Sequence, residues 1–328
     1  MNNATTVGRF IIEKQGDINI AAKIANREVN QVGLINILGS AGHMSIQTEN
    51  QRKLDIYSNE KFISNLSSGG ECCVTASEEN EDIMRIDSAV SKGARYIVAI
   101  APLNGSSNID DQMPVNTIFS IYQRRSAEVN GDLSDVLQKG KDQIATGYIT
   151  YGSLTMLTYT NGCGFNGEAF DTSIGEFCLS RPNIKISKNG ITSSINEGSS
   201  IHFPQGVKQY IKYCQVEVAA MNRPYNSGYI GSMVAYLNRK LIKGGILIYP
   251  ATATSPNSEL LLIYECNPLA FVIEQAGGGS TNGSRHILEL EVKTLPQRFP
   301  IIIGSEEMLL QAEAFLTQQS ETAYANLE

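Results

Sequence analysis

The sequence predicts a layered α/β protein, in which helices cover the faces of β-sheets. Short apolar runs of strand length alternate with longer segments of helical periodicity along the chain. The chain has 328 residues, 42% hydrophobic and 18% charged, which is enough to bury a large core in two domains. Ser, Asn and Gly cluster over 185–200, so we predict domains at 1–190 and 191–328.

Each predicted element follows from an apolar pattern bounded by turn or capping residues. The helices are expected over 9–40, 54–66, 204–214, 229–240, 268–276 and 306–317, and the strands over 72–76, 96–100, 146–151, 156–160, 245–249, 260–264 and 300–303. The first two strands each lead into polar residues, Ser77-Glu-Glu79 and Asn104-Gly-Ser-Ser107. Sheets of α/β proteins place binding sites at the carboxyl ends of such strands.

Charge and composition exclude several classes of protein. A net charge of −7 and a pI near 5.2 argue against a nucleic-acid partner. The sequence has no apolar run of membrane-spanning length, and residues 1–8 are too polar for a secretory signal, so we expect a cytoplasmic protein with no membrane partner.

Cysteine and histidine residues give no sign of a metal site. The six cysteines form no CxxC pair, and Cys72-Cys73 lies in an apolar run, so buried free thiols are expected. The three histidines are far apart in the sequence, which disfavours a histidine metal centre.

The run Ala101-Pro-Leu-Asn-Gly-Ser-Ser-Asn-Ile-Asp110 is typical of a phosphate-binding loop joined to a metal site. Its Gly and Ser residues supply a tight turn, hydroxyls and backbone N–H groups suited to an anion. A divalent ion at such a site would favour Asp at 101 and 104, but the chain has Ala101 and Asn104. Taken alone, the Asn-Gly-Ser-Ser segment could be a plain turn.

Two further acidic features are compatible with the same chemistry. Glu78 and Glu79 could be a solvated acidic corner when considered alone. Glu265, within the apolar run 260–272, needs a partner or a metal to offset its desolvation.

Several motifs together identify a family resemblance. The matching segments, in chain order, are Gly8–Gln15, Gln51–Lys61, Ser77–Glu79, Pro102–Asp110, Thr117–Tyr122, Ser194–Gly198, Tyr229–Met233, Gly244–Pro250 and Tyr264–Pro268. On these residues the chain resembles class I fructose-1,6-bisphosphatases, most closely the enterobacterial type. The resemblance implies an α-β-α-β-α sandwich, the sugar phosphatase fold shared with inositol monophosphatases.

The resemblance also implies roles for individual residues. Metal ligands would be Glu78, Leu103 through its carbonyl, and Glu265, with Ala101 and Asn104 replacing two Asp ligands, so that metal binding is expected to be weak or lost. The implied catalytic residues are Asp55, Glu79 and Glu265. The implied substrate-binding residues are Asn104, Gly105, Ser106, Ser107, Asn196, Tyr229, Met233, Tyr249 and Glu259.

The second phosphate pocket differs from the family pattern. Glu259 and Leu261 stand where the family has Lys and Arg, and Gly228 replaces an Arg that a neighbouring subunit supplies in the family. Replacing Lys by Glu changes the local charge by about two units, toward repulsion of a phosphate dianion.

These substitutions lead us to expect a fructose-1,6-bisphosphatase homologue that has lost ordinary bisphosphatase activity. It would reuse the cleft for another small-molecule reaction, with carboxylates as acid and base and with no cofactor or weakly bound Mg²⁺. The alternatives are a non-catalytic binding or regulatory protein, and a weak Mg²⁺-dependent phosphatase acting on fructose 1,6-bisphosphate or a related sugar phosphate. By resemblance, we expect a homotetramer or homodimer.

Overall fold

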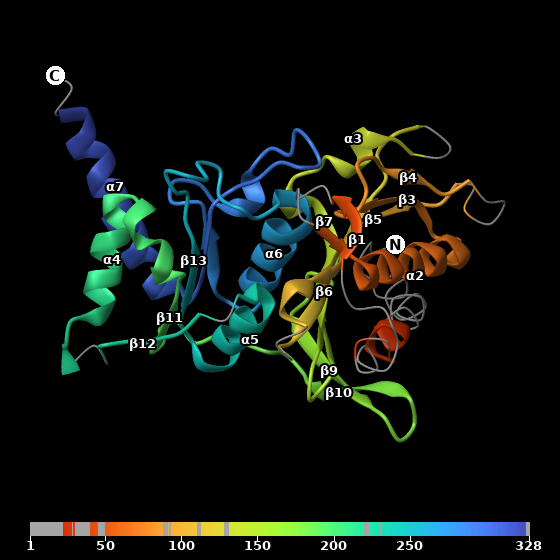
Figure 1. Ribbon diagram of the computed structural model, residues 1–328, viewed down its shortest axis with the longest axis horizontal. Coiled ribbons are helices and arrows are strands. Elements are labelled where there is room, and N and C mark those ends of the chain that lie inside the picture. Colours follow the sequence, from red (N-terminus) through yellow and green to blue (C-terminus); the bar gives the residue numbers. More distant parts are fainter. Residues whose placement is uncertain are drawn as a thin grey trace.

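Helices and sheets alternate in five layers across the computed structural model (Figure 1). The structure describes residues 22–27, 29, 40–44, 50–87, 91, 93–109, 113–127, 131–219, 223–229 and 231–325. From left to right in Figure 1, the layers are the α4/α7 pair, a small sheet, the α5/α6 pair, a large sheet and α2. The predicted α-β-α-β-α sandwich is therefore confirmed.

The large sheet has eight strands in the order β10-β9-β8-β7-β6-β5-β3-β4. They are β3 (Cys72–Ser77), β4 (Met84–Arg85), β5 (Tyr96–Asn104), β6 (Val115–Gln123), β7 (Gln143–Tyr151), β8 (Met156–Thr160), β9 (Phe165–Asp171) and β10 (Glu176–Arg181). Strands β3 and β5 are parallel, with Ser77 opposite Ile100, whereas the other neighbouring pairs are antiparallel. The polar residues that follow β3 and end β5 therefore meet at one edge of the sheet.

The small sheet has five strands in the order β12-β11-β13-β15-β14. They are β11 (Thr192–Ser194), β12 (Asn226–Ser227), β13 (Ile246–Tyr249), β14 (Gly279–Thr281) and β15 (Ile301–Gly304). A separate two-stranded sheet pairs β1 (Ser40–Met44) with β2 (Asn50–Arg52).

The helices lie between and outside the sheets. They are α2 (Lys53–Gly69), α3 (Leu133–Val136), α4 (Gln205–Gln215), α5 (Met233–Lys243), α6 (Asn267–Gln275) and α7 (Glu306–Ala325). Short 3₁₀ turns cover η1 (Ser106–Asn108), η2 (Gly140–Asp142), η3 (Glu197–His202) and η6 (Ile287–Glu289), and a π-helical turn, η5 (Leu262–Cys266), precedes α6.

Three apolar clusters fill the spaces between the layers. One joins the large sheet to α5, α6 and the small sheet, and includes Ile97, Val234 and Leu262. A second packs α2 against the other face of the large sheet, and a third packs α4 and α7 against the small sheet. Because the first cluster takes residues from both sheets, it holds the two halves of the chain together.

Most predicted elements are found, with one clear error. The predicted strand over 260–264 is wrong, because Leu262–Cys266 forms a π-helical turn in which the Cys266 N–H donates to the Leu261 carbonyl. Most of the helix predicted over 9–40 lies outside the described residues, although 22–27 are helical. All six cysteines are free, but Cys163 and Cys178 are exposed rather than buried.

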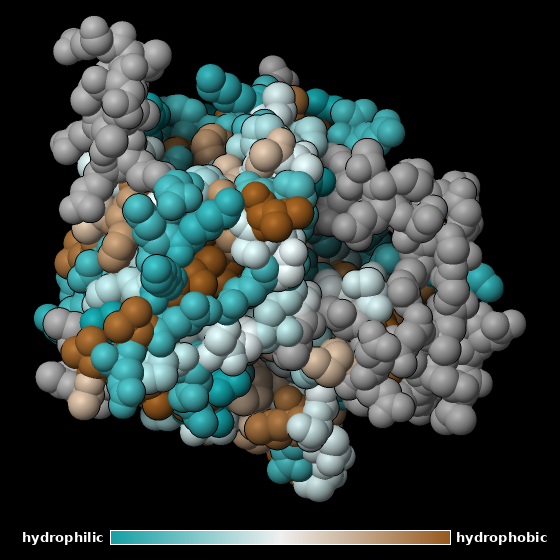
Figure 2. Space-filling view, turned by 60° about the vertical axis from the view of Figure 1, so that its left-hand side comes forward, coloured by the Kyte–Doolittle hydropathy of each residue, from teal (hydrophilic) through white to brown (hydrophobic). Residues whose placement is uncertain are grey.

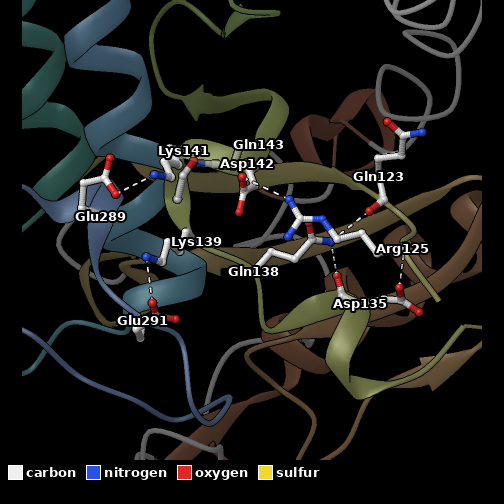
Figure 3. Close-up of polar contacts among 11 residues, drawn as sticks. Gln123, Arg125, Asp135, Gln138, Lys139, Lys141, Asp142, Gln143, Glu289 and Glu291 are labelled. Carbon is white, nitrogen blue, oxygen red and sulfur yellow. Dashed lines mark hydrogen bonds and ion pairs between the residues drawn. The ribbon is translucent and has the colours of Figure 1, made fainter.

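Ion pairs and hydrogen bonds surround the junction between the two halves (Figure 3). Lys139 pairs with Glu291 at 2.7 Å and Lys141 with Glu289 at 2.8 Å. Beside them, the Asp135 carboxylate accepts backbone N–H groups from Arg125 and Ser126, each at 2.7 Å. Burial alone would raise the pKa of Asp135, but the hydrogen bonds from Ser126 and its neighbours outweigh it and lower the pKa.

One face of the molecule is mainly polar. Figure 2 shows polar residues over much of the coloured surface of one face, with apolar residues in separate patches. Within the described part of the chain, no helix is long and apolar enough to span a membrane.

Candidate functional site

A cleft of about 500 Å³ is lined by residues from both halves of the chain. This volume is within the range typical of sites for small molecules. The cleft brings together many of the residues predicted from sequence, namely Asn104, Gly105, Ser107, Tyr229, Met233, Tyr249, Glu259 and Glu265. It also contains residues that we did not predict, namely Gly231, Ser255, Ser258, Leu260 and Arg298.

The end of β5 forms one wall of the cleft. Gly105 has a φ of 77°, a left-handed conformation that residues with a Cβ rarely adopt, and it turns the chain from the strand into η1. The Ser106 hydroxyl donates to the buried Asp55 carboxylate at 3.2 Å, which ties this loop to α2. This loop therefore presents backbone N–H groups and hydroxyls from a fixed position.

The buried carboxylate of Glu265 is hydrogen-bonded through both of its oxygens. The Asn104 side-chain amide donates to Oε1 at 2.9 Å, and the Leu261 N–H donates to Oε2 at 2.8 Å. Glu265 is 3% exposed, so these two bonds offset part of the cost of burying its charge. The sequence required a partner for Glu265, and Asn104, 161 residues away, is one.

The described residues do not form the carboxylate cluster that the family resemblance implies for divalent ions. Among them, no three His, Cys, Asp or Glu side chains gather in a way that could hold a metal ion. Ala101 is fully buried on β5 and offers no ligand atom, and Asn104 directs an N–H donor at Glu265. The donor set present here does not fit a multi-ion centre.

Three other predicted site residues, namely Glu78, Glu79 and Leu103, lie outside the lining of this cleft. Glu78 is buried, and its backbone N–H donates to the Ile100 carbonyl at 3.1 Å. Glu79 lines a separate pocket between α2 and the start of β4, together with Asn59 and Asn80. Leu103 is buried in the cluster that packs against α2.

Aromatic residues form another part of the cleft. The Tyr229 ring stacks on Tyr236, with centroids 6.0 Å apart, and lies 6.2 Å from the Tyr249 ring. Burial raises the pKa of Tyr249, with further contributions from Tyr229 and from the charges of Glu265 and Glu259. Tyr229, Tyr249 and Glu259 also line an adjoining hollow that contains Asn196.

Among the cleft residues that sequence reasoning missed, Arg298 is the charged one. It comes from the segment before β15, far in sequence from the β5 loop, and its guanidinium donates to the Glu259 carbonyl. No motif marks it, and only the fold brings it to the cleft.

Comparisons with known proteins cover both halves of the chain. Family models for the fructose-1,6-bisphosphatase N-terminal and C-terminal domains match residues 5–182 and 186–317. A curated class 1 fructose-1,6-bisphosphatase from Cytophaga hutchinsonii is 53% identical over 96% of this chain and 95% of its own length. The crystal structure of Leishmania major fructose-1,6-bisphosphatase in its holo form superposes with a TM-score of 0.87, at 33% identity over 92% of each chain.

The fold is the layered α/β fold of fructose-1,6-bisphosphatases. The chain belongs to the fructose-1,6-bisphosphatase family.

The expectation of a different reaction in the old cleft is wrong. It rested on a few substituted positions, whereas 53% identity extends over nearly the whole chain to a class 1 fructose-1,6-bisphosphatase. Of the substituted positions, Asn104 and Glu259 line the cleft, together with Gly105, Tyr229 and Tyr249. The expectation that ordinary bisphosphatase activity is doubtful is overturned by the same finding.

Proposed function

We propose that this chain is a fructose-1,6-bisphosphatase, which hydrolyses fructose 1,6-bisphosphate to fructose 6-phosphate and inorganic phosphate. The observation that carries the proposal is the 53% identity, over nearly full length, to a class 1 fructose-1,6-bisphosphatase. The cleft of about 500 Å³, lined by both halves of the chain, supports it.

The proposed chemistry uses the β5 loop to hold the reacting phosphate. The backbone N–H groups after Gly105 and the Ser107 hydroxyl would bind phosphate oxygens, while Asp55 holds Ser106 in position. Water attacks phosphorus, the bond from phosphorus to the sugar oxygen breaks, and the sugar oxygen takes up a proton. Tyr229, Tyr249 and Met233 would pack against the sugar.

Divalent ions belong to the family pattern, but the described donor set does not fit their cluster, so the proposed steps use only groups of this chain. The family resemblance also predicts a homotetramer or homodimer, which we retain as part of the proposal.

The test is phosphate release from fructose 1,6-bisphosphate with Mg²⁺, comparing wild type with the double variant Ala101→Asp/Asn104→Asp. We expect release by the wild type. The double variant should be faster, because it restores two carboxylate ligands beside Glu265. Mg²⁺ should also raise the melting temperature of the double variant more than that of wild type, because it neutralises the added buried charge.

A wild-type protein that releases no phosphate from this substrate, with or without Mg²⁺, would refute the proposed function. A double variant without a greater stabilisation by Mg²⁺ would show that positions 101 and 104 do not limit metal binding.

A further inference from the structure

The cleft lining carries more acidic than basic side chains, which disfavours a negatively charged phosphate ester. Among the described lining residues, Glu259 and Glu265 are acidic and Arg298 is basic. A sugar bisphosphate carries charge at both ends, so a cleft with this lining depends strongly on its cation.

Backbone hydrogen bonds hold Arg298 beside residues 259–261, where the family resemblance expects a Lys and an Arg. The Leu262 N–H donates to the Gln297 carbonyl at 2.7 Å, and the Phe299 N–H donates to the Leu260 carbonyl at 3.1 Å. Arg298 is thereby paired with Leu261 in an antiparallel bridge.

This pairing brings a guanidinium close to the positions from which two family cations are missing. Glu259 and Leu261 stand where the family resemblance expects Lys and Arg. Leu261 is fully buried and apolar, whereas Arg298, across the bridge from it, reaches the cleft. The Arg298 guanidinium donates to the Glu259 carbonyl, which holds it at this wall.

The chemistry of arginine suits this position. A guanidinium has five N–H donors in a rigid fork, and that of Arg298 donates to the Glu259 carbonyl. Its planar fork matches phosphate oxygens in a bidentate geometry.

We propose that Arg298 binds a phosphate group of the substrate and replaces, from the opposite strand of the bridge, the cations absent at 259 and 261. The proposal rests on the proposed function for the identity of the sugar. The Glu259 carboxylate repels a phosphate group, so Arg298 and Glu259 together set the affinity of the cleft for phosphate esters.

Calorimetric titration tests the proposal without requiring turnover. The probes are fructose 6-phosphate, fructose 1-phosphate and inorganic phosphate, with unphosphorylated fructose as the uncharged control. Arg298→Gln should weaken binding of at least one sugar phosphate by about 10-fold or more, because a charge-assisted hydrogen bond is lost. Arg298→Lys should give an intermediate affinity, and Glu259→Gln should strengthen binding. The sugar phosphate that loses more affinity identifies the end of the sugar that Arg298 holds.

Arg285→Gln, which removes the same charge from an exposed loop outside the cleft lining, is the matched control and should bind as wild type does. In steady-state kinetics, Arg298→Gln should raise KM more than it lowers kcat, which a purely structural defect would not produce. Melting temperatures show whether each variant is folded.

Wild-type affinity in a folded Arg298→Gln protein would overturn the inference, as would a wild type that binds none of the phosphate probes. Should Arg298→Gln fail to fold, unchanged affinities in both Arg298→Lys and Glu259→Gln would overturn it. Arg298-dependent binding without phosphate release would contradict the proposed function alone, and phosphate release with Arg298-independent binding would contradict this inference alone.

Discussion

Lys240 is a buried cation in the layer between the two sheets. Its ammonium group donates to the Thr192 hydroxyl at 2.9 Å and the Ser194 hydroxyl at 2.8 Å, and the residue is 1% exposed. Burial, reinforced by the charge of Arg239, lowers the pKa of Lys240 from 10.5 to about 7. The unfolded chain therefore binds this proton between pH 7 and 10.5, whereas the folded chain does not.

This difference predicts a pH-dependent stability. Below pH 7 both states are protonated and the cost of burying the charge is fully present; above pH 7 the cost declines as pH rises. The free energy of unfolding should gain up to about 1.4 kcal/mol per pH unit from Lys240 alone. Because Tyr and Cys residues titrate in the same range, the quantity to measure is the difference between wild type and Lys240→Met in denaturant unfolding from pH 6.5 to 9.

The exposed Lys243, near the end of the same helix, supplies the control. Lys243→Met should differ from wild type by a constant amount over this pH range. A constant difference for Lys240→Met as well would mean that Lys240 stays protonated in the folded protein.

At the residue scale, the sequence predicts which residue types form the site better than it predicts their partners. Asn104, Gly105 and Ser107 reach the cleft as expected, because they lie at the end of one strand and directly after it. The hydrogen bond from Asn104 to Glu265 spans 161 residues, and no local pattern encodes such a contact. Arg298 has no motif of its own, so its place in the cleft follows only from the bridge to Leu261.

At the scale of the element, close packing within the large sheet leaves no room for a side chain at one glycine of β7. Gly147 is paired with Phe119 of β6 and Tyr159 of β8. A Cβ at Gly147 would overlap the Thr158 carbonyl oxygen and lie 2.9 Å from both Phe119 Cζ and Tyr159 Cα. Gly147→Ala should therefore lower the free energy of unfolding by about 2–3 kcal/mol, measured by urea denaturation.

Gly152, just beyond the end of β7, is the matched control. A Cβ there would meet only Pro114, at 3.7 and 3.8 Å, which is ordinary contact. Gly152→Ala should change stability by less than about 1 kcal/mol. Equal effects of the two substitutions would show that β7 can shift to accept a side chain.

Strands were predicted well where an apolar run is bounded by turn residues, and less well where tertiary contacts decide. The strand predicted over 156–160 matches β8 to the residue. The apolar run over 260–264 also has strand character, but Glu265 folds back on the Leu261 N–H and the chain forms a π-helical turn. That hydrogen bond depends on holding Glu265 in the buried cleft wall, which sequence periodicity does not report.

At the scale of the whole molecule, the two sheets share a core. The central cluster contains Ile97 and Ile118 of the large sheet together with Leu247 and Ile303 of the small sheet. A shared core of this kind couples the two halves, so we expect them to unfold in a single transition.

The junction between the halves contains both a buried hydrogen-bonded side chain and an exposed ion pair, whose contributions to stability can be compared. Gln143 is 5% exposed, and its side-chain amide donates to the Gly140 carbonyl at 2.7 Å and the Asn267 carbonyl at 3.0 Å. Its amide oxygen has no hydrogen-bond partner among the described residues. Removing that buried oxygen is therefore favourable and offsets part of the stability lost with the two hydrogen bonds. Gln143→Met should therefore lower the free energy of unfolding by only about 1 kcal/mol and leave a single transition.

Lys141→Gln removes an exposed ion pair with Glu289 at the same junction and should leave the melting temperature unchanged. Thermal unfolding followed by circular dichroism measures both variants. The two losses distinguish two explanations of how the halves hold together. A larger loss for Lys141→Gln would mean that surface charges rather than the shared core couple them. A transition that splits in two for Gln143→Met would contradict the single transition expected from the shared core. A larger loss for Gln143→Met within one transition would instead assign the coupling to buried contacts that join α6 to the start of β7.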